Sequence, residues 1–250
     1  MPLLLTQADL RPLFQDRQLF DGAFAAIEQA ILAQHRSEGG SAAAAVLPLG
    51  DEATSYNVYL QGSKLGGSIR IYPTTGRRNL PRNSHVMVLL EPERGQVLAV
   101  LAGDELNPLR TAVPIGVGAR YLAQPGSRVL AILGSGRQAR AHAHVLTHAL
   151  PGVDAIRIWS PTTAHREQYG REVQAALDRP VEVCISAREA VEGAEVVSMA
   201  GFVRGACPIE AGWLAPGALL LSMGGAWPAN LDAQRFVPSL MRPEVVADSQ

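Results

Sequence analysis

The pattern of apolar and polar residues becomes regular after residue 122 of the 250-residue chain. The apolar run RVLAIL precedes a helical stretch that ends near residue 150, and IRIWS precedes a second helical stretch over residues 164–177. Further apolar runs follow at VEVCI, EVVSMA and ALLLSM, with VVAD as a candidate last strand. Apolar runs that alternate with helices indicate a parallel sheet covered on both faces. We therefore expect an α/β fold with a doubly wound parallel sheet over residues 123–250.

Residues 1–122 have a mixed pattern, typical of an α+β domain. Thr6 followed by Asp9 predicts a helix start, and FDGAFAAIEQAILAQHR has apolar residues at helical spacing. YNVYL, GSIRIY, HVMVLLE and QVLAVLAG are expected strands, and EPERG between the last two predicts a hairpin turn. The Ala-rich segment before them fits a strand or a loop. PLRTAVPIGVGARYLA is expected to be helical, and the Gln-Pro-Gly after it marks the domain boundary.

Composition and charge limit the class of partner. The chain is 47% hydrophobic, 18% charged and carries a formal net charge of -1, which argues against nucleic acid or an acidic membrane surface. No apolar run reaches membrane-spanning length, and the N-terminus lacks the pattern of a secretion signal. Cys184 and Cys207 are expected to be small buried residues in a reducing compartment. We expect a soluble cytoplasmic protein, and prefer a solvated loop to an anion site for Arg77, Arg78 and Arg82.

A glycine-rich loop follows the first regular apolar run. It consists of Gly134, Ser135, Gly136, Arg137, Gln138 and Ala139. A strand before it and a helix after it are the context that a dinucleotide loop of the Rossmann type requires. Gly134 would permit the tight turn, Gly136 the approach of a pyrophosphate and Ala139 close packing of the helix on the sheet. A second G-x-G, Gly116-Val117-Gly118, has no strand before it, so we interpret it as helix packing.

The end of the second apolar run bears on the type of dinucleotide. NAD sites commonly carry a carboxylate there for the ribose 2′-hydroxyl. This chain has Ser160, Thr162 and Arg166 instead, which could bind a 2′-phosphate, so NADP(H) is favoured with NAD(H) as the alternative. Thr162 could equally cap the following helix, and both roles can coexist.

Four segments together resemble the ornithine cyclodeaminase/mu-crystallin family. They are DGAFAAIEQAI, LNPLRTAVPIGVGARYLA, VLAILGSGRQARAHAHVL, and GAEVVSMA with GALLLSMGGAWPANLD. The resemblance implies a substrate and dimerisation domain (1–122) before a dinucleotide-binding Rossmann domain (123–250), in a homodimer. It also implies NAD(P)-dependent hydride transfer at the α-carbon of an amino acid or a cyclic imine.

The resemblance also assigns roles to single residues. Arg110 and Thr111 match the family's Arg-Thr pair, so Arg110 would hold the substrate carboxylate and Thr111 would lie near the cofactor phosphates. Arg70 takes the place of a family lysine that touches the same carboxylate, and it can bind that group but does not readily release a proton. The nicotinamide would lie against the end of EVVSMA, at Ala200. Without the resemblance, a surface salt bridge would be the better interpretation of Arg110.

The chain departs from the family at three places. It has no arginine between Ser41 and Tyr56, where a further carboxylate contact is expected. Ala226 stands where the cyclodeaminases carry a proton-handling Asp, whereas Asp232 fits the family's structural Asp better; an alanine is neither acid nor base. The family's sequences continue past VVADSQ, so we expect a shortened chain or a missing closing segment, with a cleft more open to water. The alternatives are therefore a true ornithine cyclodeaminase and a non-catalytic NADP(H)-binding protein.

Histidines supply the remaining candidates. His142, His144 and His148 lie on the helix after the glycine loop, and a solvated helix face is preferred to a metal site because no further ligand completes the set. His85 precedes an expected strand. It could donate a proton to an imine nitrogen, but a position at a surface strand start is preferred.

Overall fold

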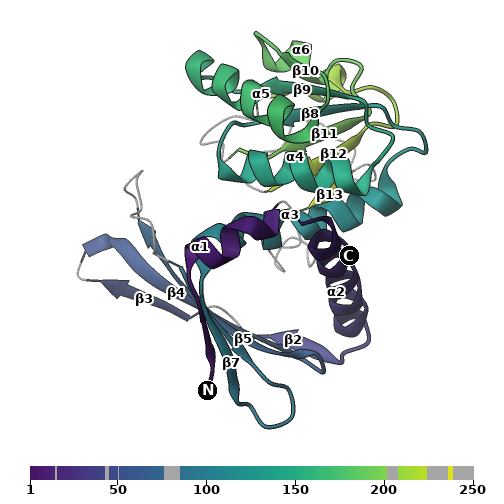
Figure 1. Cartoon of the computed structure of the whole chain (residues 1–250). Helices are drawn as coiled ribbons and strands as arrows, with labels where there is room; N and C mark the ends of the chain where they lie inside the picture. The colour runs from purple at the N-terminus through teal and green to yellow at the C-terminus, as the bar shows by residue number, and fades with distance from the viewer. Residues whose placement is uncertain are drawn as a thin grey trace. The chain divides into compact units, whose positions relative to one another are not determined.

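The computed structural model describes residues 1–14, 16–42, 45–49, 51–75, 85–201, 208–223 and 236–238. The chain divides into two compact units, Met1–Pro108 and Leu109–Gln250, and Figure 1 labels most of their helices and strands. This division lies inside helix α3 (Gly103–Leu122), whereas the domain boundary expected from the sequence lies at the end of that helix. Both divisions assign the sheet with the glycine loop to the second part. They differ in which part receives most of α3.

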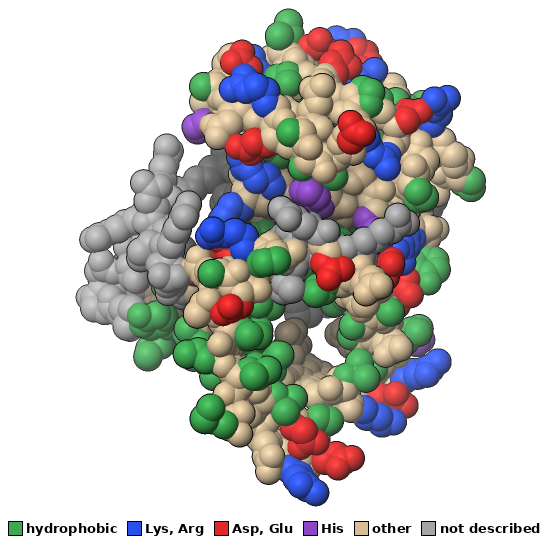
Figure 2. Space-filling model, viewed as in Figure 1, with side chains coloured by type: hydrophobic (Ala, Val, Ile, Leu, Met, Phe, Trp, Pro, Cys, Tyr) green, Lys and Arg blue, Asp and Glu red, His purple; other side chains and the backbone are tan. Residues whose placement is uncertain are grey.

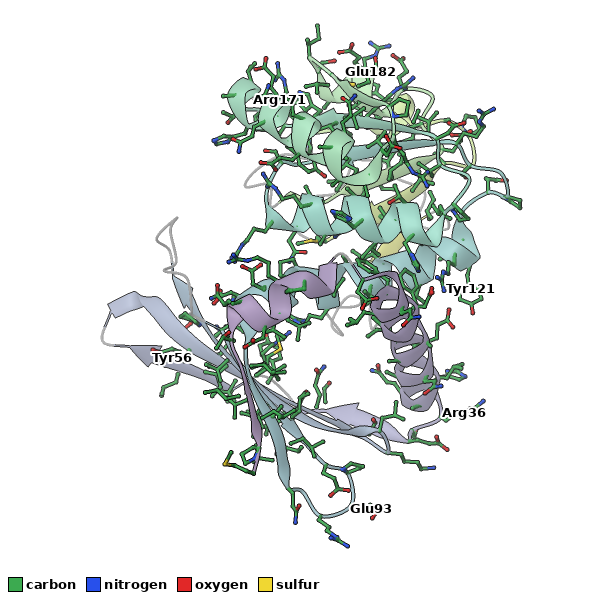
Figure 3. The ribbon with its side chains drawn as sticks, in the orientation of Figure 1. Arg36, Tyr56, Glu93, Tyr121, Arg171 and Glu182 are labelled. Atoms are coloured by element: carbon green, nitrogen blue, oxygen red, sulfur yellow. The ribbon has the colours of Figure 1, made fainter. Side chains whose placement is uncertain are left out.

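The first unit is built on a seven-stranded sheet with the order β1-β7-β6-β5-β4-β2, to which β3 adds by pairing with β4. Its strands are β1 (Leu3–Leu5), β2 (Gly39–Ser41), β3 (Ala45–Leu49), β4 (Asp51–Ser63), β5 (Gly66–Thr75), β6 (Val86–Leu90) and β7 (Val97–Ala102). Neighbouring strands are antiparallel except for β1 and β7. The four expected strands and the β6–β7 turn are confirmed, and Glu93 marks that turn in Figure 3. β3 makes the later part of the Ala-rich segment a strand.

Two helices and a 3₁₀ turn accompany this sheet. They are α1 (Gln7–Leu10), η1 (Arg11–Phe14) and α2 (Arg17–His35). The predicted helix start is confirmed, because Thr6 and Asp9 form a reciprocal capping box. The predicted spacing in α2 is confirmed as helix, but only Phe20 and Phe24 of its apolar residues are buried. In the described ranges, no helix combines the length and the apolar character that a membrane span requires.

The second unit contains a six-stranded parallel sheet in the order β10-β9-β8-β11-β12-β13. Its strands are β8 (Val129–Leu133), β9 (Ala155–Trp159), β10 (Val181–Val183), β11 (Val196–Met199), β12 (Leu219–Ser222) and β13 (Phe236–Pro238). Counted along the chain this order is 3-2-1-4-5-6, the order of dinucleotide-binding sheets, with its switch point between β8 and β11. The expected α/β fold is therefore confirmed. The candidate strand VVAD lies outside the described residues.

Helices cover both faces of this sheet, which explains the nearly continuous apolar runs of its strands. They are α4 (Arg137–Ala149), α5 (Thr163–Leu177), α6 (Ala187–Val191) and the 3₁₀ turn η2 (Ala211–Trp213). Leu130 and Ile132 of β8 pack into a core with α3, α4 and α5. Ala131 and Leu133 of the same strand pack into a second core that includes α6. Consecutive residues of one strand thus face opposite cores and hold the loop after β8 between them.

Candidate functional site

The loop after β8 turns sharply at the switch point of the second sheet. Gly134 has a φ of +129°, and an added Cβ there would lie 2.9 Å from the backbone nitrogen of Gly201. The Gly134 N–H donates to the Trp159 carbonyl over 2.8 Å, and the Ala200 N–H donates to the Leu133 carbonyl over 3.0 Å. The loops after β8, β9 and β11 therefore meet through their backbones. Only glycine fits position 134, because φ is positive and the backbone of Gly201 leaves no room for a Cβ.

The start of α4 lies immediately after this turn. Gly136 is its N-cap residue and offers no side-chain hydrogen bond to the first turn. An added Cβ at Gly136 would meet no protein atom within 4 Å, so nothing in the described protein requires glycine there. Gly136 and Arg137 are exposed. Backbone N–H groups and the positive end of the helix dipole are thus available to an anion. Since no contact within the described protein requires glycine at position 136, a glycine there fits the close approach of a phosphate.

Side chains behind the loop hold it in place. Arg140 donates from Nη1 to the Ser135 carbonyl over 2.8 Å and from Nε to Glu172 over 2.6 Å. The Tyr169 hydroxyl donates to the carbonyl of Ala139 over 2.6 Å, and Ala139 is fully buried. Burial raises the pKa of Tyr169 well above its usual value, so the hydroxyl stays a donor. The half-buried Gln138 completes the loop, and its Oε1 has no hydrogen-bond partner.

Three residues expected to distinguish NADP from NAD meet at the end of β9. Ser160 is buried, and its hydroxyl lies 3.5 Å from the carbonyl of Thr162. Arg166 donates from Nη1 to the Ser160 carbonyl over 3.2 Å. Thr162 is the N-cap residue of α5, but its side chain makes no capping hydrogen bond, and the first turn of α5 carries no acidic residue. The three are therefore neighbours at a helix start whose first turn has no acidic residue.

A second cluster lies on the sheet of the first unit, around Arg70. The β5 sequence Ile-Arg-Ile-Tyr would place the isoleucines inward by alternation, yet Arg70 is only 8% exposed while Ile69 and Ile71 are half-buried. The guanidinium carbon of Arg70 lies 4.4 Å from the ring centroid of Tyr59 and 5.3 Å from that of Tyr72. These two rings stack 5.6 Å apart, and the Tyr72 hydroxyl donates to that of Tyr59.

The charge of Arg70 is not balanced by a carboxylate in the described part of the chain. Its Nε is buried without a hydrogen-bond partner, and burial lowers the pKa of Arg70 from its usual value. A guanidinium remains protonated in proteins, so the cost of its burial is offset only by an anion or by the faces of the aromatic rings. Binding of a substrate carboxylate by Arg70 stays a prediction, and these surroundings agree with it.

His85 adjoins the same cluster, and the predicted surface position is wrong. The residue is 8% exposed, and its ring lies 5.2 Å from the ring of Tyr72. Its Nδ1–H donates to Oδ1 of the buried Asp104 over 2.8 Å. The Gly103 N–H donates to the His85 carbonyl, which ties the start of α3 to the residue before β6. Sequence reasoning missed Asp104, and the signal available was an acidic pair directly after an apolar strand.

Arg110 and Thr111 lie on α3 in the second unit, whereas Arg70 belongs to the first. Thr111 is buried and Arg110 is half-buried. Gly116 and Gly118 lie inside the same helix, so helix packing is the correct interpretation of this second G-x-G. A shared role of Arg70 and Arg110 in one substrate site stays a prediction.

The histidines of α4 do not form a solvated face, so that prediction is wrong. His142 is 0% exposed, its Nδ1 lies 2.7 Å from the hydroxyl oxygen of Ser198, and its Nε2 has no partner. Burial lowers the pKa of His142 to about 4 and also lowers the pKa of the half-buried His144. His142 is therefore a neutral core residue between α4 and β11.

One group of potential metal ligands lies close together in the described ranges: Glu182, Cys184 and Glu189. Glu182 is labelled in Figure 3. Burial raises the pKa of the Cys184 thiol to about 11, and Glu189 accepts a hydrogen bond from the Ile185 N–H over 2.7 Å. A protonated thiol is a poor metal ligand. Cys184 is buried and free, as expected.

Several residues singled out in the sequence lie outside the described residues. They are Arg77, Arg78, Arg82, Cys207, Ala226 and Asp232.

Comparison with known proteins identifies the family. Residues 52–244 match the model of the ornithine cyclodeaminase/mu-crystallin family. Ketimine reductase mu-crystallin of Rattus norvegicus is 32% identical over 179 residues, which cover 71% of this chain and 54% of the rat protein. The chain spans about half the length of the curated relatives it matches.

Solved structures agree on the fold. Δ1-Pyrroline-2-carboxylate reductase of Thermococcus litoralis, in complex with NADH and L-proline, has a TM-score of 0.78 at 20% identity and covers 93% of this chain and 72% of its own. An archaeal alanine dehydrogenase dimer with bound NAD has a TM-score of 0.73 at 21% identity, with 88% and 66% covered. With the family model matching most of its length, the chain belongs to the ornithine cyclodeaminase/mu-crystallin family.

Proposed function

We propose that the protein is an NAD(P)-dependent oxidoreductase that transfers hydride at the α-carbon of an amino acid or a cyclic imine. The observation that carries this proposal is the buried guanidinium of Arg70, which lies on two tyrosine rings with no carboxylate to balance it in the described chain. Amino acids and α-imino acids share the carboxylate that such a group binds. The rat relative is named a ketimine reductase, and the Thermococcus structure holds L-proline, which agrees with this class of substrate.

Arg70 and Arg110 are proposed to hold the substrate carboxylate. The planar guanidinium donates two parallel hydrogen bonds to a carboxylate, which fixes both the position and the orientation of the α-carbon. Fixing the reacting carbon within attack distance is a large part of what such a site contributes to the rate. Because an arginine keeps its proton, neither residue is proposed as an acid or a base.

The dinucleotide is proposed to bind at the switch point of the second sheet. Its pyrophosphate would lie on residues 134–139, with Thr111 near the phosphates and Ala200 near the nicotinamide. The uncapped start of α4 and the open space at Gly136 support this assignment. When bound, the nicotinamide would supply or accept the hydride.

NADP(H) is proposed over NAD(H). The support is the meeting of Ser160, Thr162 and Arg166 at an α5 start without acidic residues. The two solved relatives hold NADH and NAD, so the choice needs a direct test. Fluorescence titration is expected to give tighter binding of NADPH than of NADH, with the preference lost in Arg166→Ala. Tighter binding of NADH to the unaltered protein would overturn this proposal.

A homodimer in the cytoplasm is also proposed. The alanine dehydrogenase relative is a dimer. Strands of the first unit expose the large apolar side chains of Leu3, Leu4, Val46, Leu47, Leu60, Val97 and Leu98. Figure 2 shows hydrophobic side chains gathered over this part of the chain. The buried free Cys184 fits a reducing compartment. Light scattering on the purified protein is expected to give twice the chain mass, and a monomer at micromolar concentration would contradict it.

Activity is tested by following NADPH absorbance with cyclic imino acids and with pyruvate plus ammonia. Turnover is expected with at least one of them, and Arg70→Met is expected to lower kcat/KM about 100-fold or more. Arg94→Met, on an exposed turn, is the matched control and should act like the unaltered protein. Nucleotide binding without turnover would favour a non-catalytic binding protein. Release of ammonia from ornithine without imine reduction would favour a cyclodeaminase.

A further inference from the structure

His85 and Arg70 occupy neighbouring positions on one face of the first sheet. Arg70 pairs with Tyr59 on β4 and with Met87 on β6. Ile71 pairs with Val86. Tyr72, two residues after Arg70, therefore lies opposite His85, two residues before Met87. Side chains two apart on a strand share a face, so Arg70, Tyr72 and His85 point the same way. Diagonal neighbours on antiparallel strands have Cα atoms about 7–8 Å apart.

The ring of Tyr72 connects the two groups. It lies 5.3 Å from the guanidinium carbon of Arg70 and 5.2 Å from the centroid of the His85 ring. Arg70 and His85 are therefore neighbours of the same ring, and a small planar molecule whose carboxylate lies on Arg70 would extend its next atoms along this face of the sheet, where the imidazole lies. An α-imino carboxylate carries its nitrogen on the carbon directly attached to the carboxylate.

Asp104 fixes how the imidazole is presented. Its Oδ1 accepts from Nδ1 of His85 over 2.8 Å, and its Oδ2 lies within hydrogen-bond distance of the His85 N–H and of Gln7, at 3.4 Å each. A carboxylate on one ring nitrogen selects the tautomer and the orientation of the ring. The proton on Nδ1 faces Asp104, so Nε2 is the nitrogen that exchanges a proton with any other group.

We propose that His85, oriented by Asp104, donates the proton to the nitrogen of an α-imino carboxylate that Arg70 holds. This inference rests on the proposed function. The imine carbon accepts hydride from a reduced nicotinamide and forms a C–H bond, while the π electrons of the C=N bond move to nitrogen. The nitrogen forms an N–H bond with the proton from Nε2 of the imidazolium. A neutral imidazole remains and takes a new proton from solvent.

This step predicts a rate of imine reduction that falls as pH rises, because only the imidazolium carries the proton to be given. In the described chain, His85 contacts the carboxylate of Asp104 from α3 and the ring of Tyr72 from β5. The next groups are Arg70 of β5, which lies on the rings of Tyr72 and of Tyr59 from β4, and the uncharged Gln7 of α1, which lies beside Asp104.

His85→Asn is the decisive variant. The amide nitrogen of Asn stands in the place of Nδ1, so the bond to Asp104 is kept while Nε2 is removed. We expect kcat to fall about 100-fold or more, while KM for the imine and the affinity for NADPH stay within about twofold. The fall of rate with pH should disappear as well. His35→Asn, an exposed histidine of the same unit, is the matched control and should behave as the unaltered protein.

A second measurement needs no turnover. Pyridine-2-carboxylate is a planar α-imino carboxylate, and its ring nitrogen accepts a hydrogen bond from His85 only when Nε2 carries a proton. Calorimetry over a series of pH values, in two buffers of different ionisation enthalpy, should therefore detect proton uptake on binding to the unaltered protein. His85→Asn should bind without uptake, and Arg70→Met should not bind. If His85→Asn does not fold, His85→Gln takes its place: its amide gives up no proton, so kcat should fall and proton uptake should disappear, although the bond to Asp104 is not kept.

The outcomes separate the two proposals. Unchanged kcat or unchanged proton uptake in His85→Asn would overturn the role of His85 alone, provided that Arg70→Met loses binding. Binding that survives in Arg70→Met, together with no reduction of any imine, would overturn the proposed function itself.

Discussion

The glycine loop of the second unit and the Arg70 cluster of the first unit meet opposite physical requirements. Around Gly134 every close contact is backbone against backbone, and the protein itself leaves no room for a side chain. Around Arg70 the contacts are side chains from separate strands, and the protein leaves a buried charge without a carboxylate in its described part. Contacts within the protein account for Gly134, which serves the fold, whereas Arg70 is proposed to find its partner in the carboxylate of a ligand.

The largest difference is expected between substitutions of the two loop glycines, Gly134 and Gly136. Gly134→Ala forces a positive φ on a residue with a Cβ and brings that atom 2.9 Å from a backbone nitrogen, so we expect a loss of about 3 kcal/mol or more in the free energy of unfolding. Gly136→Ala meets no protein atom and should leave stability within about 0.5 kcal/mol. It should still weaken NADPH binding. Urea unfolding and fluorescence titration measure the two effects.

If both substitutions destabilise the protein equally, it is wrong that the fold requires glycine at position 134 but not at position 136.

A pH titration of stability tests the interior of the second unit. Burial lowers the pKa of His142 to about 4 from an ordinary 6.5. Between these values the unfolded chain binds a proton that the folded chain does not, so the free energy of unfolding falls as pH drops from 6.5 towards 4. The full effect of the shift is about 3 kcal/mol, and it is absent above pH 7. Urea unfolding at several pH values should show this slope, and His142→Leu should reduce it.

His35→Asn, which removes an exposed histidine of the first unit, is the control. An unchanged slope in His142→Leu would show that other groups account for the acid sensitivity.

The smallest expected effect concerns Thr162. Its side chain makes no capping hydrogen bond, so Thr162→Ala should change the free energy of unfolding by less than about 0.5 kcal/mol, below the usual loss for a working N-cap. The same substitution should weaken NADPH more than NADH in parallel titrations. Thr6→Ala, in a complete capping box, provides the comparison and should cost about 1 kcal/mol. A larger stability loss at Thr162 than at Thr6 would contradict this interpretation.

The two regions also differ in how far the sequence predicts them. Strand, glycine turn and helix follow one another within residues 129–149, so local pattern was enough to identify the loop and the α/β fold. The short elements α6 and β13 carry too few residues to show a period. α3 begins at Gly103 rather than at Pro108, because the acidic residues after Gly103 form its first turn.

Predicting the Arg70 cluster requires the register in which the strands pair, and the local sequence pattern does not contain that information. His85 follows the polar pair Asn83-Ser84 and reads as a surface residue, but Asp104, nineteen positions later, pairs with it and buries it. Arg70 is singled out only through the family resemblance, and nothing in the local pattern of β5 shows that Tyr59 of the neighbouring strand covers its guanidinium. Such pairings are set by cross-strand register, which depends on the whole sheet.

Calorimetric binding of L-proline tests whether Arg70 is held ready for a carboxylate. The unaltered protein and the Arg94→Met control should bind with the same affinity, and Arg70→Met should bind at least about 100-fold more weakly while unfolding at an equal or higher urea concentration. Equal affinity in Arg70→Met, or a marked loss of its stability, would contradict the claim, because Arg70 would then serve the fold and not a ligand.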